Sequence, residues 1–277
     1  MLRVIIDGPR DPRMNMAIDE AIARSRRRKD FDTLRLYMWL PSGVSLGRRQ
    51  SFHETVVLDE IIRRGYVYVR RPTGGAALLH PAFRELTYSV VLSSNHYLYS
   101  MDVASSAAKI AEGIAGAINA LGLEAGVRGL GGGGEARFCY LNPGSSDVMI
   151  LGRKISGSAQ RREWGSLLQH GTILLEYDPE DFTSVIRVSD EEKIYATQRI
   201  AGLRDFIRDL DLERLVELVI DSMRKVLGYE DFFVGGLESD EMRLAIDLFN
   251  KKYSSDEWNI MGVDKFSGGE ASSGGNS

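Results

Sequence analysis

The order of the predicted secondary structure constrains the fold most strongly: strands dominate the first two thirds of the chain, with two or three helices among them, and helices dominate the rest. Runs of β-branched and aromatic residues between turn residues predict strands, and apolar residues recurring every third or fourth position predict helices. The predicted strands are 2–6, 33–40, 43–46, 66–70, 85–92, 147–151 and 171–175. The predicted helices are 15–24, 58–64, 103–121, 179–186, 212–227 and 240–252. Because strands and helices do not alternate, the pattern favours an α+β fold with a mixed, mostly antiparallel sheet flanked by helices over a doubly wound parallel sheet.

The chain is long enough for one large domain or two small ones, with 277 residues. We expect a main domain at 1–205, which holds all the candidate site residues, and a helical C-terminal extension at 206–265 packed on it. The tail 266–277 is of low complexity and is expected to be disordered. Segment 129–134 contains five glycines in six residues, so we expect a loop there.

Composition excludes several classes of function. A net charge of −4 with 27% charged residues gives no electrostatic reason to expect nucleic acid, and the basic run at 24–29 fits the solvated end of a helix. No apolar run of about 18 residues exists, so no membrane span is predicted, and the apolar part of the N-terminus is too short for a signal peptide. Cys139 is the single cysteine, which excludes an internal disulfide and favours a cytoplasmic protein.

The first segment with possible chemistry is RRPTGGAALLH at residues 70–80. Arg70 and Arg71 place two cations beside a Gly-Gly turn, where a ligand can approach the backbone closely and amides can hold phosphate or carbonyl oxygens. The segment lacks the residues of a P-loop and of a dinucleotide fingerprint. Taken alone, a plain hairpin turn with surface arginines explains it equally well.

Two further segments contain a candidate lysine and a candidate nucleophile. In GRKISGSAQ at 152–160, small neighbours let Lys154 present its ammonium to a ligand; a hairpin turn with a solvated lysine is the alternative. Cys139 becomes a nucleophile if a cation such as Arg137 or Lys154 stabilises its thiolate, and is otherwise a small buried apolar residue. His170 begins an apolar strand, where it either contacts a ligand or is satisfied at the sheet end. The remaining histidines, His53 and His96, lack cysteine or carboxylate partners at metal-ligand spacing, so no metal site is predicted.

Several motifs in order resemble the lipoate–protein ligase A and octanoyltransferase family. They are DPRMNMAIDEAI (11–22), SLGRRQ (45–50), RRPTGGAALLH (70–80), ELTYSVV (85–91), GRKISGSAQRR (152–162), QHGTILL (169–175) and KKYSSDEWN (251–259). The resemblance covers about residues 2–260 and implies the α+β fold of biotin and lipoate protein ligases.

Two chemistries occur in that family. One is ATP- and Mg²⁺-dependent ligation of lipoate through lipoyl-adenylate, in some members with the accessory domain on a separate protein. The other is cofactor-free transfer of octanoyl from acyl carrier protein through a cysteine thioester. Cys139, at its spacing before Lys154, resembles the LipM-type octanoyltransferase subgroup. The resemblance implies that lipoyl domains of 2-oxoacid dehydrogenase complexes or the glycine cleavage H protein are the acceptors, with no nucleic acid or membrane partner.

The resemblance also implies the site residues. Cys139 and Lys154 are the expected catalytic residues. Substrate contacts are expected from Arg70, Arg71, Thr73, Gly74, Gly75, Ala76, His80, Gly157, Ser158, Ala159, His170, Gly171 and Thr172.

The sequence departs from the family at a few positions. Ala76-Ala77 and Pro81 are unusual, Phe83-Arg84 looks inserted, and Arg48-Arg49 replaces the usual Tyr-Phe before Gln50, at the expected mouth of the acyl pocket. A non-catalytic protein that only binds lipoate or lipoyl domains is a third interpretation.

Overall fold

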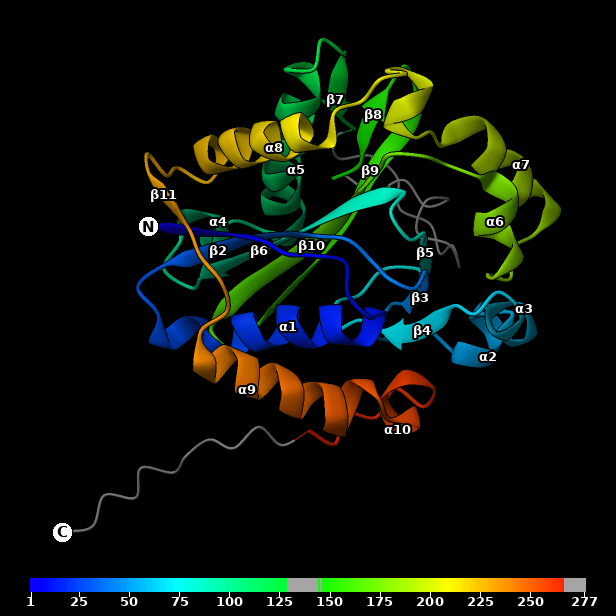
Figure 1. Ribbon diagram of the computed structural model, residues 1–277, viewed down its shortest axis with the longest axis horizontal. Helices are drawn as coiled ribbons and strands as arrows, with labels where there is room; N and C mark the ends of the chain where they lie inside the picture. The colour runs from blue at the N-terminus through cyan, green and yellow to red at the C-terminus, as the bar shows by residue number, and fades with distance from the viewer. Residues whose placement is uncertain (129–143, 145, 267–277) are drawn as a thin grey trace.

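An eight-stranded mixed sheet forms the centre of the protein in the computed structural model, which describes residues 1–128, 144 and 146–266. The strand order is β11-β1-β2-β6-β10-β9-β8-β7 (Figure 1). β1 pairs in parallel with β2 and β11, and the other neighbours are antiparallel. The strands are β1 (Leu2–Ile6), β2 (Asp32–Tyr37), β6 (Glu85–Ser93), β7 (Ala125–Val127), β8 (Val148–Ile150), β9 (Arg153–Glu163), β10 (Ser166–Leu174) and β11 (Phe232–Val234). The predicted α+β class with a mostly antiparallel sheet is confirmed.

Helices cover both faces of this sheet, and each face has its own apolar core. Helices α1 (Pro12–Ser25) and α9 (Ser239–Leu248) lie on one face, and α5 (Val103–Asn119) and α8 (Leu212–Val226) lie on the other (Figure 1). Successive strand residues point to opposite faces, so Leu167 joins the α5/α8 core and Leu168 joins the α1/α9 core. The central strands β6 and β10 are therefore buried on both faces along almost their whole length.

A second, three-stranded sheet in the order β4-β3-β5 lies beside the first. Its strands are β3 (Gly43–Leu46), β4 (Val67–Arg70) and β5 (Leu78–His80). A third apolar core joins it to four short helices, α2 (Phe52–Thr55), α3 (Leu58–Arg63), α6 (Pro179–Ser184) and α7 (Asp190–Arg199). The loop between β4 and β5, residues 71–77, extends from this small sheet to the large one, because Arg161 of β9 donates to the Pro72 carbonyl at 2.7 Å.

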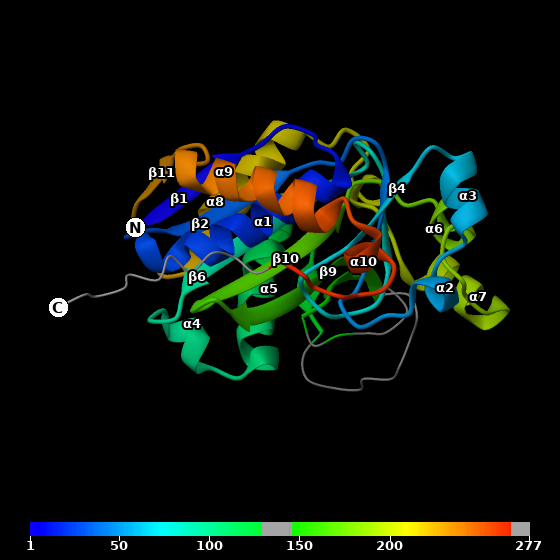
Figure 2. The ribbon, with the colours of Figure 1, turned by 90° about the horizontal axis from the view of Figure 1, so that it is seen from below.

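The C-terminal part is helical as predicted, except that β11 pairs with β1 at the edge of the sheet. The remaining elements are the helices α4 (Tyr97–Ser100) and α10 (Asp256–Asn259), the π-helix η3 (Phe249–Tyr253), and the 3₁₀ turns η1 (Arg26–Arg28) and η2 (Leu203–Asp205). Figure 2 shows α10 next to β4. Residues 267–277 and the glycine-rich segment 129–134 lie outside the described residues, so the predictions for them stay predictions.

The longest differences from the predicted secondary structure lie in the segment 153–174 and in helix α7; several elements of three or four residues were also not predicted. Residues 153–163, for which no element was predicted, form the long strand β9, and β10 begins at Ser166 rather than at residue 171. Gly157, Ser158 and Ala159 have weak strand propensity, so pairing with β10 decides their conformation. Helix α7, whose only buried residue is Ala196, was also not predicted. Within the described residues, no helix is both long and apolar enough to cross a membrane.

Candidate functional site

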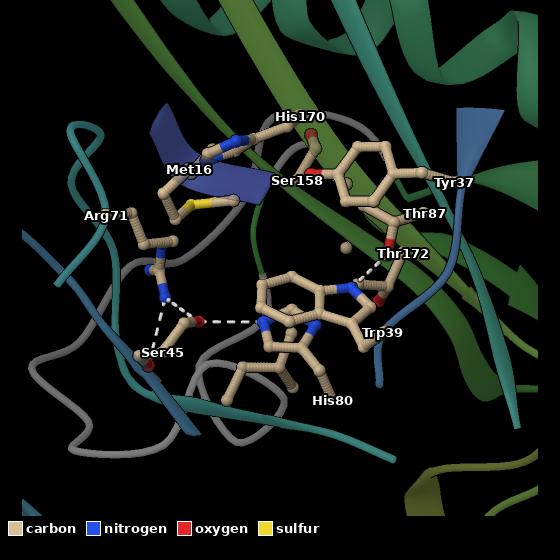
Figure 3. Close-up of a pocket in the computed structure, with 14 residues that line it drawn as sticks. Met16, Tyr37, Trp39, Ser45, Arg71, His80, Thr87, Ser158, His170 and Thr172 are labelled. Carbon is tan, nitrogen blue, oxygen red and sulfur yellow. Dashed lines mark hydrogen bonds between the residues drawn. The ribbon is translucent and has the colours of Figure 1, made fainter. Parts of the chain in front are cut away.

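A pocket lies between the α1-facing side of the large sheet, helix α1 and the small sheet (Figure 3). The pocket and its open mouth enclose about 360 Å³. Its floor crosses four strands, because Gly157, Thr172, Thr87 and Tyr37 lie opposite one another in register. The lining residues are Met16, Tyr37, Trp39, Ser45, Arg71, Leu78, His80, Thr87, Gly157, Ser158, Ala159, His170, Gly171 and Thr172.

The end of the pocket at β2 has mainly apolar walls. Trp39 stacks on His80 with ring centroids 3.8 Å apart, and its Nε1 donates to Thr87 Oγ1 at 2.8 Å (Figure 3). The Tyr37 hydroxyl donates to Asp19 at 2.8 Å, so its polar atom is also satisfied within the protein. Together with Met16, these rings form an apolar slot at this end of the pocket.

The opposite end of the pocket, at β9, lies next to Lys154. The Lys154 Nζ forms an ion pair with Asp147 Oδ1 at 2.8 Å, and both side chains are only 4% exposed. A Cβ on Gly157 would lie 2.9 Å from Lys154 Cε and 3.0 Å from Nζ, so the ammonium lies directly over this glycine. The alternative of a solvated turn lysine is wrong, because the β8–β9 turn is at residues 151–152 and Lys154 is buried in the strand that follows.

Arg71 holds the Gly74-Gly75 turn in place. Its Nη2 donates to the carbonyls of Gly74 and Ala76 at 2.8 and 2.9 Å, and its Nη1 donates to Ser45 Oγ at 2.8 Å. This hydroxyl lies 2.8 Å from His80 Nε2, and the other ring nitrogen of His80 lies 2.7 Å from Glu85 Oε1. A continuous network therefore links the Glu85 carboxylate, at the start of β6, to the backbone of the turn. Gly75 adopts a φ of +85°, which favours glycine.

Arg70, the neighbour of Arg71, has a different role. Its guanidinium donates to six backbone carbonyls, in segments 47–50 and 258–260, and its side chain does not line the pocket. Burial lowers the pKa of Arg70. The structure therefore places Arg70 outside the pocket lining, where it joins the C-terminal turn to the small sheet, and its predicted contact with substrate stays a prediction.

His170 lines the pocket from the middle of β10. Its Nδ1 lies 3.2 Å from Asp19 Oδ2, and its Nε2 lies 2.7 Å from Thr73 Oγ1. Burial lowers the pKa of His170, although the Asp19 carboxylate opposes this effect. A neutral His170 can thus hold Thr73 and the 71–77 loop against the sheet. Thr73 is fully buried and tethers the loop through this contact, and its predicted contact with substrate stays a prediction.

Most of the predicted contact residues meet at this pocket. Arg71, His80, Gly157, Ser158, Ala159, His170, Gly171 and Thr172 line it, and Gly74 and Gly75 form the turn beside it. Cys139 lies outside the described residues, and its role stays a prediction. The sequence analysis did not single out Asp147, Trp39 or Asp19. For Asp147 the one local signal is an acidic residue at the start of a predicted apolar strand.

The sequence of the chain matches a known protein family. The model of the lipoyl protein ligase A/B catalytic domain matches residues 11–224. The chain belongs to this family. Octanoyltransferase LipM of Kyrpidia tusciae is 35% identical over 93% of this chain and 97% of its own length, and further relatives with that name are 32–33% identical.

Solved structures of family members share the fold over nearly the whole chain. A bi-partite lipoate protein ligase from Thermoplasma acidophilum superposes with a TM-score of 0.81 at 30% identity, covering 96% of this chain and 98% of that one. A lipoate-protein ligase A bound with ATP gives a TM-score of 0.80 at 30% identity, covering 94% and 99%.

Proposed function

We propose that this protein is an octanoyltransferase of protein lipoylation, which moves an octanoyl group from acyl carrier protein to a lysine of a lipoyl domain. The observation that carries the proposal is the near full-length match to curated octanoyltransferases. The pocket supports it, because an apolar slot leads from the rings of β2 to a buried lysine at β9.

The proposed reaction has two acyl transfers. In the first, the Cys139 thiolate attacks the donor thioester, an acyl-cysteine forms, and the carrier thiol leaves with a proton. In the second, the lysine amine of the acceptor attacks this thioester, an amide forms and the Cys139 thiol is released. The octanoyl chain lies in the pocket across β10, β6 and β2.

Lys154 is the proposed partner of Cys139 in both steps. Its ammonium favours the thiolate and stabilises the negative charge that develops on the carbonyl oxygen. Asp147 acts as a positioning residue, because its ion pair holds the Lys154 Nζ over Gly157. The transferase reaction requires no cofactor.

The proposed acceptors are lipoyl domains of 2-oxoacid dehydrogenase complexes and the glycine cleavage H protein. One structural neighbour supports this class of acceptor, since the Thermoplasma ligase was described together with its E2 lipoyl domain.

Intact mass spectrometry tests the proposal. The wild-type protein incubated with octanoyl-carrier protein should gain one octanoyl group, lose it when apo-lipoyl domain is added, and pass it to that domain. Cys139→Ser should gain no thiol-labile adduct. An unmodified wild type, or the same adduct on Cys139→Ser, contradicts the mechanism.

The solved neighbours favour one alternative, an ATP-dependent lipoate ligase with Mg²⁺, in which a separate protein supplies the accessory domain. This alternative predicts pyrophosphate release that requires lipoate and ATP and survives Cys139→Ser. No group of three or more metal-ligating side chains occurs among the described residues, and ATP-bound Mg²⁺ requires none.

A further inference from the structure

A second hollow lies on the outer side of the Gly74-Gly75 turn, and arginines dominate its wall. This groove is open, and together with its mouth it encloses about 1160 Å³, with Arg48, Arg49 and Arg161 along it. We call it the arginine groove. A Cβ on Gly74 would meet nothing within 4 Å, so bare backbone forms the rim between the groove and the pocket.

The cations of the groove exceed the acids that face them. Arg48 Nη1 is buried and has no hydrogen-bond partner among the described residues, and the Glu163 carboxylate lies 3.8 Å from it. The same carboxylate already pairs with Arg161, whose Nη1 donates to the Pro72 carbonyl. Glu20 and Asp264 act on Arg161 as well, but both also form ion pairs with Lys252.

The crowding of these cations has an electrostatic cost. Burial and the charge of Arg48 lower the pKa of Arg161 to about 10. An anion held between the two guanidinium groups would remove this repulsion, and two planar guanidinium forks suit the oxygens of a phosphate.

The groove lies in a suitable direction from the reaction centre. The pocket runs from Gly157 across the strands, whereas Ala159 and Arg161 follow Gly157 along β9 on the same face of the sheet. Four residues of strand span roughly 13 Å. If the carbonyl of a thioester lies at Gly157, its acyl chain can extend across the sheet. The part of the donor on the thiol side can then follow β9 and pass over the Gly74-Gly75 turn.

We propose that the arginine groove binds the phosphate ester of the pantetheine arm that carries the octanoyl thioester. This inference rests on the proposed function. A nucleotide triphosphate has the same chemistry, so the experiment includes both sources of phosphate.

The test compares two small donors, octanoyl-phosphopantetheine and octanoyl-pantetheine, in octanoyl transfer to a lipoyl domain. The wild type should prefer the phosphorylated donor in kcat/KM. Arg48→Gln should reduce this preference about tenfold, which corresponds to one lost charged contact. Arg161→Gln should do the same, whereas Glu163→Gln should increase the preference. Arg63→Gln, an exposed arginine on α3, is the matched control and should keep the wild-type ratio.

Each other outcome overturns a specific statement. Transfer from both donors with equal kcat/KM in the wild type refutes phosphate recognition while leaving the proposed function intact. Equal losses with both donors in Arg48→Gln show a structural role only. If Arg48→Gln impairs ATP-driven acylation but not the donor preference, the phosphate source is a nucleotide. Transfer from neither small donor, together with no transfer from octanoyl-carrier protein by a folded wild type, refutes the proposed function itself.

Discussion

Gly157→Ala provides the sharpest test of the site, because the added methyl group would meet the end of Lys154. The new Cβ would lie 2.9 Å from Lys154 Cε and 3.0 Å from Nζ. A normal carbon contact requires about 3.5 Å, so the ammonium must retreat by roughly half an ångström. The atoms that must move are the far end of a flexible side chain, so the free energy of unfolding should fall by only about 1 kcal/mol.

The rate should respond more strongly than the stability. A misplacement of about 1 Å at a reacting group can cost a hundredfold, so half that displacement predicts roughly a tenfold loss in the rate of Cys139 acylation. Single-turnover mass spectrometry measures this rate, and thermal unfolding measures stability, with an expected decrease of about 2–4 °C in Tm.

Gly126→Ala is the matched control, because a Cβ at this strand glycine would meet nothing within 4 Å. It should change neither rate nor Tm. A wild-type acylation rate in Gly157→Ala would refute the placement of the Lys154 ammonium at the reaction centre. The same placement would be refuted if the acylation rate of Gly157→Ala fell only in proportion to the fraction of protein that is unfolded.

Three further predictions concern the framework of the site. In Gly171→Ala a Cβ would lie 2.6 Å from both the Tyr88 hydroxyl and the Gly157 carbonyl, so urea unfolding should show a loss of about 3 kcal/mol; wild-type stability would contradict the packing. Arg70→Met leaves buried carbonyls unpaired and should cost about 3 kcal/mol in the same assay, while the KM for donor stays near wild type if Arg70 has only a structural role. Burial lowers the pKa of His170, so just below pH 6.5 the unfolded chain binds a proton at this residue and the folded protein does not. The free energy of unfolding should therefore decrease as the pH falls from that value, and it should decrease less steeply in His170→Gln.

Local sequence determined much of the architecture. Strand 43–46 was predicted with its exact bounds, and helix 212–227 was predicted to within one residue, because turn residues before a strand and a strong apolar periodicity are local properties. The ordered motifs also predicted that Lys154, His170 and the Gly74-Gly75 turn belong to one site.

The tertiary structure decided what adjacent residues do. Arg70 and Arg71 are identical side chains at the end of one strand, yet Arg71 holds the turn beside the pocket and Arg70 binds carbonyls near residue 258. Successive residues of an extended chain point in opposite directions, and partners 188 positions away in sequence leave no local signal. Lys154 is a similar case, because its burial against Asp147 depends on a strand pairing that weak local propensity does not predict. The role predicted for Cys139, by contrast, rests on the sequence alone.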